Sequence, residues 1–304
     1  IHNFKGSGSY EEFYQKAVTN YVKAVKYGNK YIYRSMPRML TLWFDSDMDE
    51  IDTDRGRKLA ETITKQIILK MSEELPKNIW ISALPQLVSR ILHRNKDVQR
   101  AVVRILKYAL ADFPHQTLWA MVVVIKSTIS GRRQQANQIM TLAKKLCSSE
   151  VNKLFVVFLE LMEQLEKLCH FDPESKKGAR VSKLSVSVDF NRLKRMMPVM
   201  VSIPSQSHFW HDSIVDEENH DDAQSIVTIQ DIFDEMTVLS SLQRPKKIKF
   251  LGSDGKEYTF LAKPKDDLRK DSRMMEFTGM LNRMLQRDPT TRRKQLYLRT
   301  YVVI

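Results

Sequence analysis

Apolar residues in the first 170 positions recur at the spacing of an α-helix. In the first periodic stretch, the apolar face consists of Phe13, Ala17, Tyr21, Ala24 and Val25. Similar stretches follow, and Pro76, Pro114 and Gly131 fall between them, where proline and glycine interrupt helices. The pattern therefore predicts antiparallel helices, without a β-sheet, over residues 10–170.

The first two predicted helices form a hairpin. Gly28 stops the first helix, and Pro37 lies near the middle of the second, Lys30–Leu42, which an acidic loop at Asp45–Asp54 follows. Later helices are predicted at Arg57–Glu74, Ile79–His93, Asp97–Asp112, His115–Ser127, Arg132–Leu146 and Val151–Cys169. There is no exact sequence repeat, so a tetratricopeptide-like solenoid is predicted from the pairing of helices alone.

The pattern changes at Asp172. Residues 172–187 are rich in Pro, Ser, Lys and Gly, which predicts a loop. A short amphipathic helix is predicted at Phe190–Val201, with the apolar residues Leu193, Met196, Met197 and Met200. Residues 205–224 are acidic and contain several histidines, and we interpret them as an exposed linker rather than a metal site. From Ser225 to Leu239 the apolar positions fit either a helix or a strand.

Two strand-like runs come next, with a turn between them. Lys247–Leu251 alternates charged and apolar residues, and Glu257–Lys263 is rich in aromatic and β-favouring residues. Gly252–Gly255 is a turn signal, so the two runs predict a β-hairpin. Pro264 disfavours a helix that continues directly from the second strand. Asp271 is predicted to cap an amphipathic helix with the apolar residues Met274, Phe277, Leu281 and Met284.

The composition is that of an ordinary soluble globular protein. The 304 residues are 42% hydrophobic and 28% charged. The longest apolar run, Leu118–Ile125, is far shorter than the roughly 18–20 residues that span a bilayer, and no basic-then-apolar leader is expected. Cys147 and Cys169 have no second pair of cysteines that would suggest zinc. We therefore predict reduced thiols in a cytosolic or nuclear protein.

The formal net charge of +13 allows two interpretations. One is a surface that binds nucleic acid, and the other is a scatter of solvated Lys and Arg side chains on helix faces. Basic residues are dense only at Arg244–Lys249 and Arg292–Lys294. We favour the scattered arrangement.

Several side chains in the helical region could suggest a ligand site. Aromatic and methionine residues at helical spacing are far more often core residues, and we predict this for Trp43, Trp80, Trp119 and Met121. The histidines share no metal-ligand spacing with cysteines or acids, so we assign no chemistry to His93, His115 and His170.

Short motifs at both ends of the chain carry a resemblance to a known family. Towards the end they are SLQRPKKI (241–248), GSDGKEY (252–258), KPKDDLRKD (263–271), MEF (275–277) and LRTYVVI (298–304). Near the start, KYIYRSMPRMLTLWFD (30–45) is similar to the end region of a helical FAT domain. In order and spacing the motifs resemble the phosphoinositide 3-kinase-related protein kinases, and KPKDDLRKD is most similar to their checkpoint-kinase branch.

This resemblance implies an α+β fold. An antiparallel α-helical, TPR-like solenoid segment would be followed by a partial kinase N-lobe with an antiparallel β-sheet and one packed helix. The implied divisions are the C-terminal part of the FAT domain over residues 1–183, and a connecting helix and acidic linker over 184–224. The truncated N-lobe of a PI3/PI4-kinase-like catalytic domain would occupy residues 225–304.

The resemblance also implies an ATP-binding site. Spacing alone would make Lys263 a surface lysine, but the motif implies that it contacts an ATP phosphate and that Asp266 holds its ammonium. Asp271 is expected at the inner end of the pocket, facing Tyr301. Leu261 alternates with Lys263 along the strand, so it is expected to line the adenine slot.

The loop that would cover the phosphates is expected between two strands, at 239–245. Leu239, Ser240 and Ser241 are its expected contacts to ATP, although a plain strand-to-strand turn would fit the same sequence. The loop lacks the G-x-G-x-x-G pattern of ordinary protein kinases, in agreement with the phosphoinositide-kinase-like branch. The chain also contains no D-F-G and no catalytic-loop Asp and Asn. We expect the ligands of Mg²⁺ or Mn²⁺ to lie beyond this fragment, which should be inactive alone.

The function implied for the parent protein is phosphorylation of Ser/Thr-Gln sites in DNA-damage and replication-stress signalling. The expected partners are a regulatory subunit of the type that accompanies checkpoint kinases, protein substrates, and single-stranded DNA reached through other proteins. A homodimer of heterodimers in the nucleus, away from membranes, is expected. Two alternatives stay open, namely a related phosphoinositide lipid kinase and a non-enzymatic helical scaffold for protein or nucleic acid.

Overall fold

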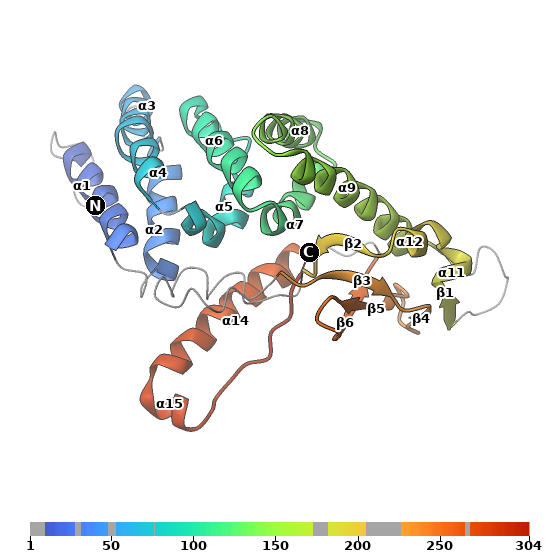
Figure 1. Cartoon of the computed structure of the whole chain (residues 1–304). Helices are drawn as coiled ribbons and strands as arrows, with labels where there is room; N and C mark the ends of the chain where they lie inside the picture. Colours follow the sequence, from blue (N-terminus) through green and yellow to red (C-terminus); the bar gives the residue numbers. More distant parts are fainter. Residues whose placement is uncertain are drawn as a thin grey trace. The chain divides into compact units, whose positions relative to one another are not determined.

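The computed structural model describes residues 10–27, 32–47, 53–75, 77–172, 182–204, 226–264 and 268–303. The chain forms two compact units (Figure 1). The described residues up to Ser148 make the first unit, and those from Ser149 onward make the second. Within the described residues, no helix is long and apolar enough to cross a membrane.

The first unit is a succession of helices (Figure 1). The helices are α1 (Tyr10–Tyr27), α2 (Ile32–Phe44), α3 (Thr53–Thr62), a π-helical segment (Ile63–Leu69), α4 (Lys70–Glu74), a 3₁₀ segment (Lys77–Ala83), α5 (Leu84–Ser89), α6 (Lys96–Asp112), α7 (Pro114–Ile125) and α8 (Ser130–Lys144). Consecutive helices pack together, as α1 does with α2 and α6 with α7. The described part of residues 10–170 contains no strand, which confirms the helical prediction.

The aromatic residues of this unit belong mainly to its core. Trp43 is 0% exposed, and its Nε1 donates a hydrogen bond to Thr64 Oγ1 at 2.9 Å. Trp80 and Met121 are also buried, whereas Trp119 is only partly buried. A buried tryptophan N–H usually has a hydrogen-bond partner, and for Trp43 the threonine in the π-helical segment supplies it. The core interpretation is confirmed for three of the four residues.

One predicted helix has a different form. The single helix expected at Ile79–His93 is a 3₁₀ segment, Lys77–Ala83, followed by α5, which ends at Ser89. Pro85 lies at the start of α5. Proline has no amide hydrogen to donate and clashes with the preceding turn, so it disfavours one continuous α-helix here and is better tolerated in the first turn of α5.

The second unit combines a long helix, α9 (Ser149–His170), with a six-stranded antiparallel sheet. The strands are β1 (Lys183–Ser185), β2 (Val199–Ser202), β3 (Thr228–Ile232), β4 (Glu235–Val238), β5 (Lys246–Gly252) and β6 (Glu257–Ala262). The order is β1-β4-β5-β3-β2, and β6 pairs with β5 as well.

Strands β3 and β4 pair with successive parts of β5. Thr237 of β4 lies opposite Lys247, and Ile232 of β3 lies opposite Phe250. The interruption between them is held by Asp234, whose carboxylate accepts hydrogen bonds from the Ser187 backbone N–H and the Ser185 hydroxyl. These hydrogen bonds lower the pKa of Asp234. Residues 226–239, which fitted either a helix or a strand, therefore form an interrupted strand.

The prediction of a helix at Phe190–Val201 was wrong in its second half. Two short helices, α11 (Val186–Asp189) and α12 (Asn191–Arg195), come first, and residues 199–202 form β2. Pro198 blocks continuation of a helix, and the valines on either side of Met200 favour a strand. The sheet therefore includes β1 and β2, which lie before the N-lobe boundary predicted at residue 225.

Helix α14 (Arg269–Arg287) follows the sheet, and the short α15 (Pro289–Arg293) follows α14. An extended segment then returns alongside α14 (Figure 1). Asn282 holds this segment, because its Nδ2 donates to Leu298 O at 2.7 Å and its Oδ1 accepts from Leu298 N at 2.8 Å. The helix agrees with the predicted apolar periodicity, but three of the residues on that face are exposed, namely Met274, Phe277 and Met284.

Candidate nucleotide-binding site

Lys263 lies immediately after β6, at the end of the sheet where the chain leads towards α14. Its Nζ is 3.8 Å from Asp271 Oδ2. The Lys263 side chain is 33% exposed and the Asp271 side chain 40% exposed, so solvent reaches both groups. An ammonium oriented by a carboxylate at an open strand end can bind a phosphate by charge and by hydrogen bonding.

The hairpin before Lys263 sets the register of its strand. Gly255 adopts φ +76°, which glycine tolerates, and the Gly255 N–H donates to Gly252 O at 2.9 Å. Gly252 itself leaves no room for a side chain, because a Cβ there would lie 2.8 Å from Val227 Cγ1. The turn sequence therefore forms the hairpin predicted for it. Strand β6 pairs residue by residue with β5: Glu257 lies opposite Leu251 next to the turn, and Ala262 lies opposite Lys246 at the other end.

Asp271 does not cap α14, in contrast to the prediction. The residue before the first helical turn is Leu268, and Asp271 is the third residue of the helix. A carboxylate in the first turn is still favourable, because the helix dipole is positive there. The shift of the helix start places Asp271 within the turn, with its carboxylate towards Lys263.

The connection between β4 and β5, residues 239–245, is a tight loop. The Leu239 N–H donates to Pro245 O at 2.9 Å, and the Arg244 N–H donates to Ser241 O at 3.0 Å. Arg244 has φ +49°, a left-handed conformation that closes the turn. Ser240 and Ser241 are exposed at its tip. The loop is therefore a strand-to-strand turn with polar groups available for a ligand.

Register places the loop and Lys263 at the same end of the sheet. Lys246 of β5 lies between Val238 of β4 and Ala262 of β6. Val238 is the residue before the loop, and Ala262 is the residue before Lys263. Loop 239–245 and Lys263, two parts of the predicted ATP site, thus each follow directly after a residue that pairs with Lys246.

The other residues predicted to contact ATP are Leu261, Leu239, Tyr301 and Asp266. Leu261 is 44% exposed and lies opposite Lys247 in the pairing of β5 and β6. Leu239 is also exposed. Tyr301 is 57% exposed on the extended segment, where its backbone N–H donates to Met275 Sδ at 3.5 Å. Asp266 lies outside the described residues.

The described residues hold no cluster of three or more His, Cys, Asp or Glu side chains that could bind a metal ion. Cys147 and Cys169 are not in disulfide bonds, and burial raises the pKa of both. A raised pKa keeps a thiol protonated and unreactive. We therefore assign neither cysteine a part in the candidate site.

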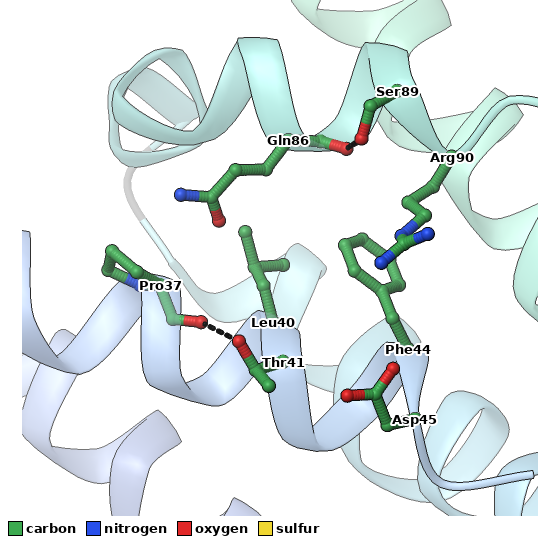
Figure 2. A pocket seen from close by; sticks show the side chains of 8 residues that line it. All are labelled: Pro37, Leu40, Thr41, Phe44, Asp45, Gln86, Ser89 and Arg90. Carbon is green, nitrogen blue, oxygen red and sulfur yellow. Dashed lines mark hydrogen bonds between the residues drawn. The ribbon is translucent and has the colours of Figure 1, made fainter. Parts of the chain in front are cut away.

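A separate pocket of about 160 Å³ lies between α2 and α5 in the first unit (Figure 2). Three of its polar side chains already have contacts. Thr41 Oγ1 donates to Pro37 O, Ser89 Oγ donates to Gln86 O, and the Arg90 guanidinium lies over the Phe44 ring. We interpret it as a gap in helix packing.

Sequence reasoning missed Lys246, which is only 2% exposed. Its Nζ donates a hydrogen bond to Cys169 O, the two atoms being 2.6 Å apart. Strand alternation could have indicated this burial, since Lys246 shares a face of β5 with the buried residues Ile248 and Phe250.

Comparisons with known proteins identify the family. The family model "Serine/threonine-protein kinase ATR-like, HEAT repeats" matches residues 62–162, within the helical region. The "Serine/threonine-protein kinase ATR" of Arabidopsis thaliana is 40% identical over 302 residues, which are 95% of this chain. "Protein kinase rad3" of Schizosaccharomyces pombe is 31% identical over 317 residues, covering 96% of this chain. The chain belongs to the ATR family.

ATR-family relatives are much longer than this chain. The chain spans 11% of the Arabidopsis protein and 13% of the fission yeast protein. The helical region of this ATR-family chain matches HEAT repeats, which, like tetratricopeptide repeats, stack pairs of helices.

A solved structure supports the fold of the ATR-family chain. "FAT and kinase domain of CtTel1" superposes with a TM-score of 0.75 and covers 96% of this chain and 19% of that one. The two sequences are 17% identical, so this likeness concerns the fold alone. The mostly helical array followed by an antiparallel sheet agrees with the predicted fold class.

Proposed function

We propose that this chain is part of an ATP-dependent kinase that phosphorylates serine and threonine residues of proteins. The observation that carries this proposal is the Lys263–Asp271 pair, which lies at the sheet end from which loop 239–245 also leaves. Family membership supports it, since the relatives are named serine/threonine-protein kinases.

Each residue of the site has a part in binding ATP. The Lys263 ammonium offsets the charge of a phosphate, and Asp271 limits the positions that the ammonium can take. Ser240 and Ser241 offer hydroxyl and backbone N–H donors from the loop. Leu261 offers an exposed apolar surface for adenine. Mg²⁺ or Mn²⁺, when bound, neutralises charge that develops on the phosphates, and we place its ligands outside the described residues.

The position of Tyr301 completes the proposal for the pocket. Its segment runs beside α14, the helix that carries Asp271, and the hydrogen bonds of Asn282 to Leu298 keep it there. We place the tyrosine at the inner end of the pocket, facing Asp271. Asp266, beyond the described residues, would be a second acid near Lys263.

The finer role follows the ATR family. We propose that the kinase modifies Ser or Thr followed by Gln, in DNA-damage and replication-stress signalling in the nucleus. Its partners would be a regulatory subunit of the ATR-interacting-protein type and single-stranded DNA, reached through other proteins. Two such heterodimers would form a homodimer.

The decisive experiment is a comparison of substrates with the full-length protein. Purified kinase is incubated with labelled ATP and Mg²⁺, and with a Ser-Gln peptide, an Ala-Gln peptide or phosphoinositide vesicles. Label in the Ser-Gln peptide alone is expected. Label in the lipid would indicate a phosphoinositide kinase instead, and no label in either substrate would favour a helical scaffold.

A further inference from the structure

Lys246 is a buried lysine that the proposed binding site does not use. Lysine is rarely fully buried unless its charge has a partner, and here the side chain is 2% exposed. Its Nζ donates to the backbone carbonyl of Cys169 at 2.6 Å. Burial lowers the pKa of this ammonium. A charge kept out of water in this way requires a compensating contact, and the Cys169 carbonyl provides one.

The acceptor belongs to the end of a long helix. Cys169 is the second-last residue of α9, and the last four carbonyls of a helix have no partner within it. The helix dipole also makes this end negative, which favours a cation. The Lys246 side chain therefore joins the C-terminal end of α9 to the first residue of β5.

Lys246 pairs with two strands that lead to the proposed ATP site, β4 on one side and β6 on the other. On one side it pairs with Val238, after which loop 239–245 begins. On the other it pairs with Ala262, after which Lys263 follows. One row of three paired residues thus connects the end of α9 with both the loop and the phosphate-binding lysine.

We propose that Lys246 is a positioning residue of the nucleotide site. By fixing this row against α9, it sets the places of loop 239–245 and Lys263, and so sets the affinity for ATP. The proposal rests on the proposed function, because it assumes that ATP binds at Lys263. It also means that the end of α9 and the ATP site are coupled, and such coupling is reciprocal.

The test replaces Lys246 with methionine in the full-length kinase, which keeps an unbranched side chain but removes the ammonium. We expect KM for ATP to rise about tenfold and kcat to fall less than about threefold, because the site is displaced but its groups remain. The control is Lys256→Met, which removes an exposed lysine at the far end of the same hairpin. Its KM and kcat should stay within about twofold of the unmodified values.

A purely structural lysine would give another result. Loss of folded protein would lower kcat in proportion to the folded fraction and leave KM for ATP unchanged. An unchanged KM in Lys246→Met would therefore overturn the proposal. Lys263→Ala is measured in parallel to separate the two ideas. If Lys263→Ala keeps its activity, the proposed ATP site is wrong, and the role of Lys246 is wrong with it.

Hydrogen exchange of the unmodified protein covers the case in which Lys246→Met does not fold. A non-hydrolysable ATP analogue should slow exchange of the amides in loop 239–245 and in the last turn of α9 together, because the coupling is reciprocal. Slower exchange in the loop, with no change in α9, would also overturn the proposal.

Discussion

At the scale of single residues, Lys263 is the side chain that we propose contacts the ATP phosphate. Replacement by alanine removes the cation, and replacement by arginine exchanges a compact ammonium for a wide planar group. We expect either change to lower peptide phosphorylation by the full-length kinase about 100- to 1000-fold, as loss of other preorganised charge contacts does. The measurement is the rate at saturating ATP, after a thermal melt has shown that the variant is folded.

The control for Lys263 is Lys256→Ala in the same hairpin, because Lys256 is exposed and its partner is the turn residue Asp254. Its rate should match that of the unmodified kinase.

Asp271→Asn should lower the rate less than Lys263→Ala, roughly tenfold, because the lysine stays but is less well oriented. A folded Lys263→Ala variant with near-normal turnover would mean that the phosphate lies elsewhere.

At the scale of elements, the extended segment after α15 depends on one side chain of α14. Asn282 makes both of its hydrogen bonds to the backbone of Leu298. Asn282→Ala should cost about 1 kcal/mol of unfolding free energy, the low end for lost hydrogen bonds, because Leu298 is 44% exposed and water reaches the released groups. The expected local effect is faster hydrogen exchange of the Leu298 amide.

The matched control is Thr278→Ala on the same helix. The Thr278 hydroxyl donates to Met274 O within α14, so its removal leaves the extended segment in place. Exchange at Leu298 should then be unchanged. If Asn282→Ala also left the exchange at Leu298 unchanged, other contacts would hold the segment, and the proposed place of Tyr301 would lose its main support.

At the scale of the whole molecule, we predict that the 304 residues do not transfer phosphate by themselves. The sequence has no D-F-G motif, and the described residues contain no cluster of metal-binding side chains. We therefore expect the purified 304-residue chain to leave a Ser-Gln peptide unlabelled with ATP and Mg²⁺, while the full-length kinase labels it. Phosphate transfer by the contaminant-free chain would refute the placement of the site.

Local patterns were sufficient for the features that depend on neighbours in the chain. Helical periodicity, with its proline and glycine breaks, predicted the array from α1 to α9, because a helix is stabilised by contacts three and four residues apart. The hairpin at Gly252–Gly255 followed from turn chemistry in the same way. The hairpin also predicted Lys263 as the last residue of the second strand, and β6 ends one residue earlier, at Ala262.

Contacts between distant residues required the folded chain. Lys246 and Cys169 are 77 positions apart, and no local period indicates that a carbonyl would compensate the buried ammonium. Residues 199–201, the end of the expected helix, lie in β2 instead because pairing with β3 outweighs a weak amphipathic pattern. The start of α14 at Arg269 moved Asp271 from a cap into the first turn. The Lys246–Cys169 contact and the β2–β3 pairing depend on long-range packing, whose energy the order of neighbouring residues does not contain.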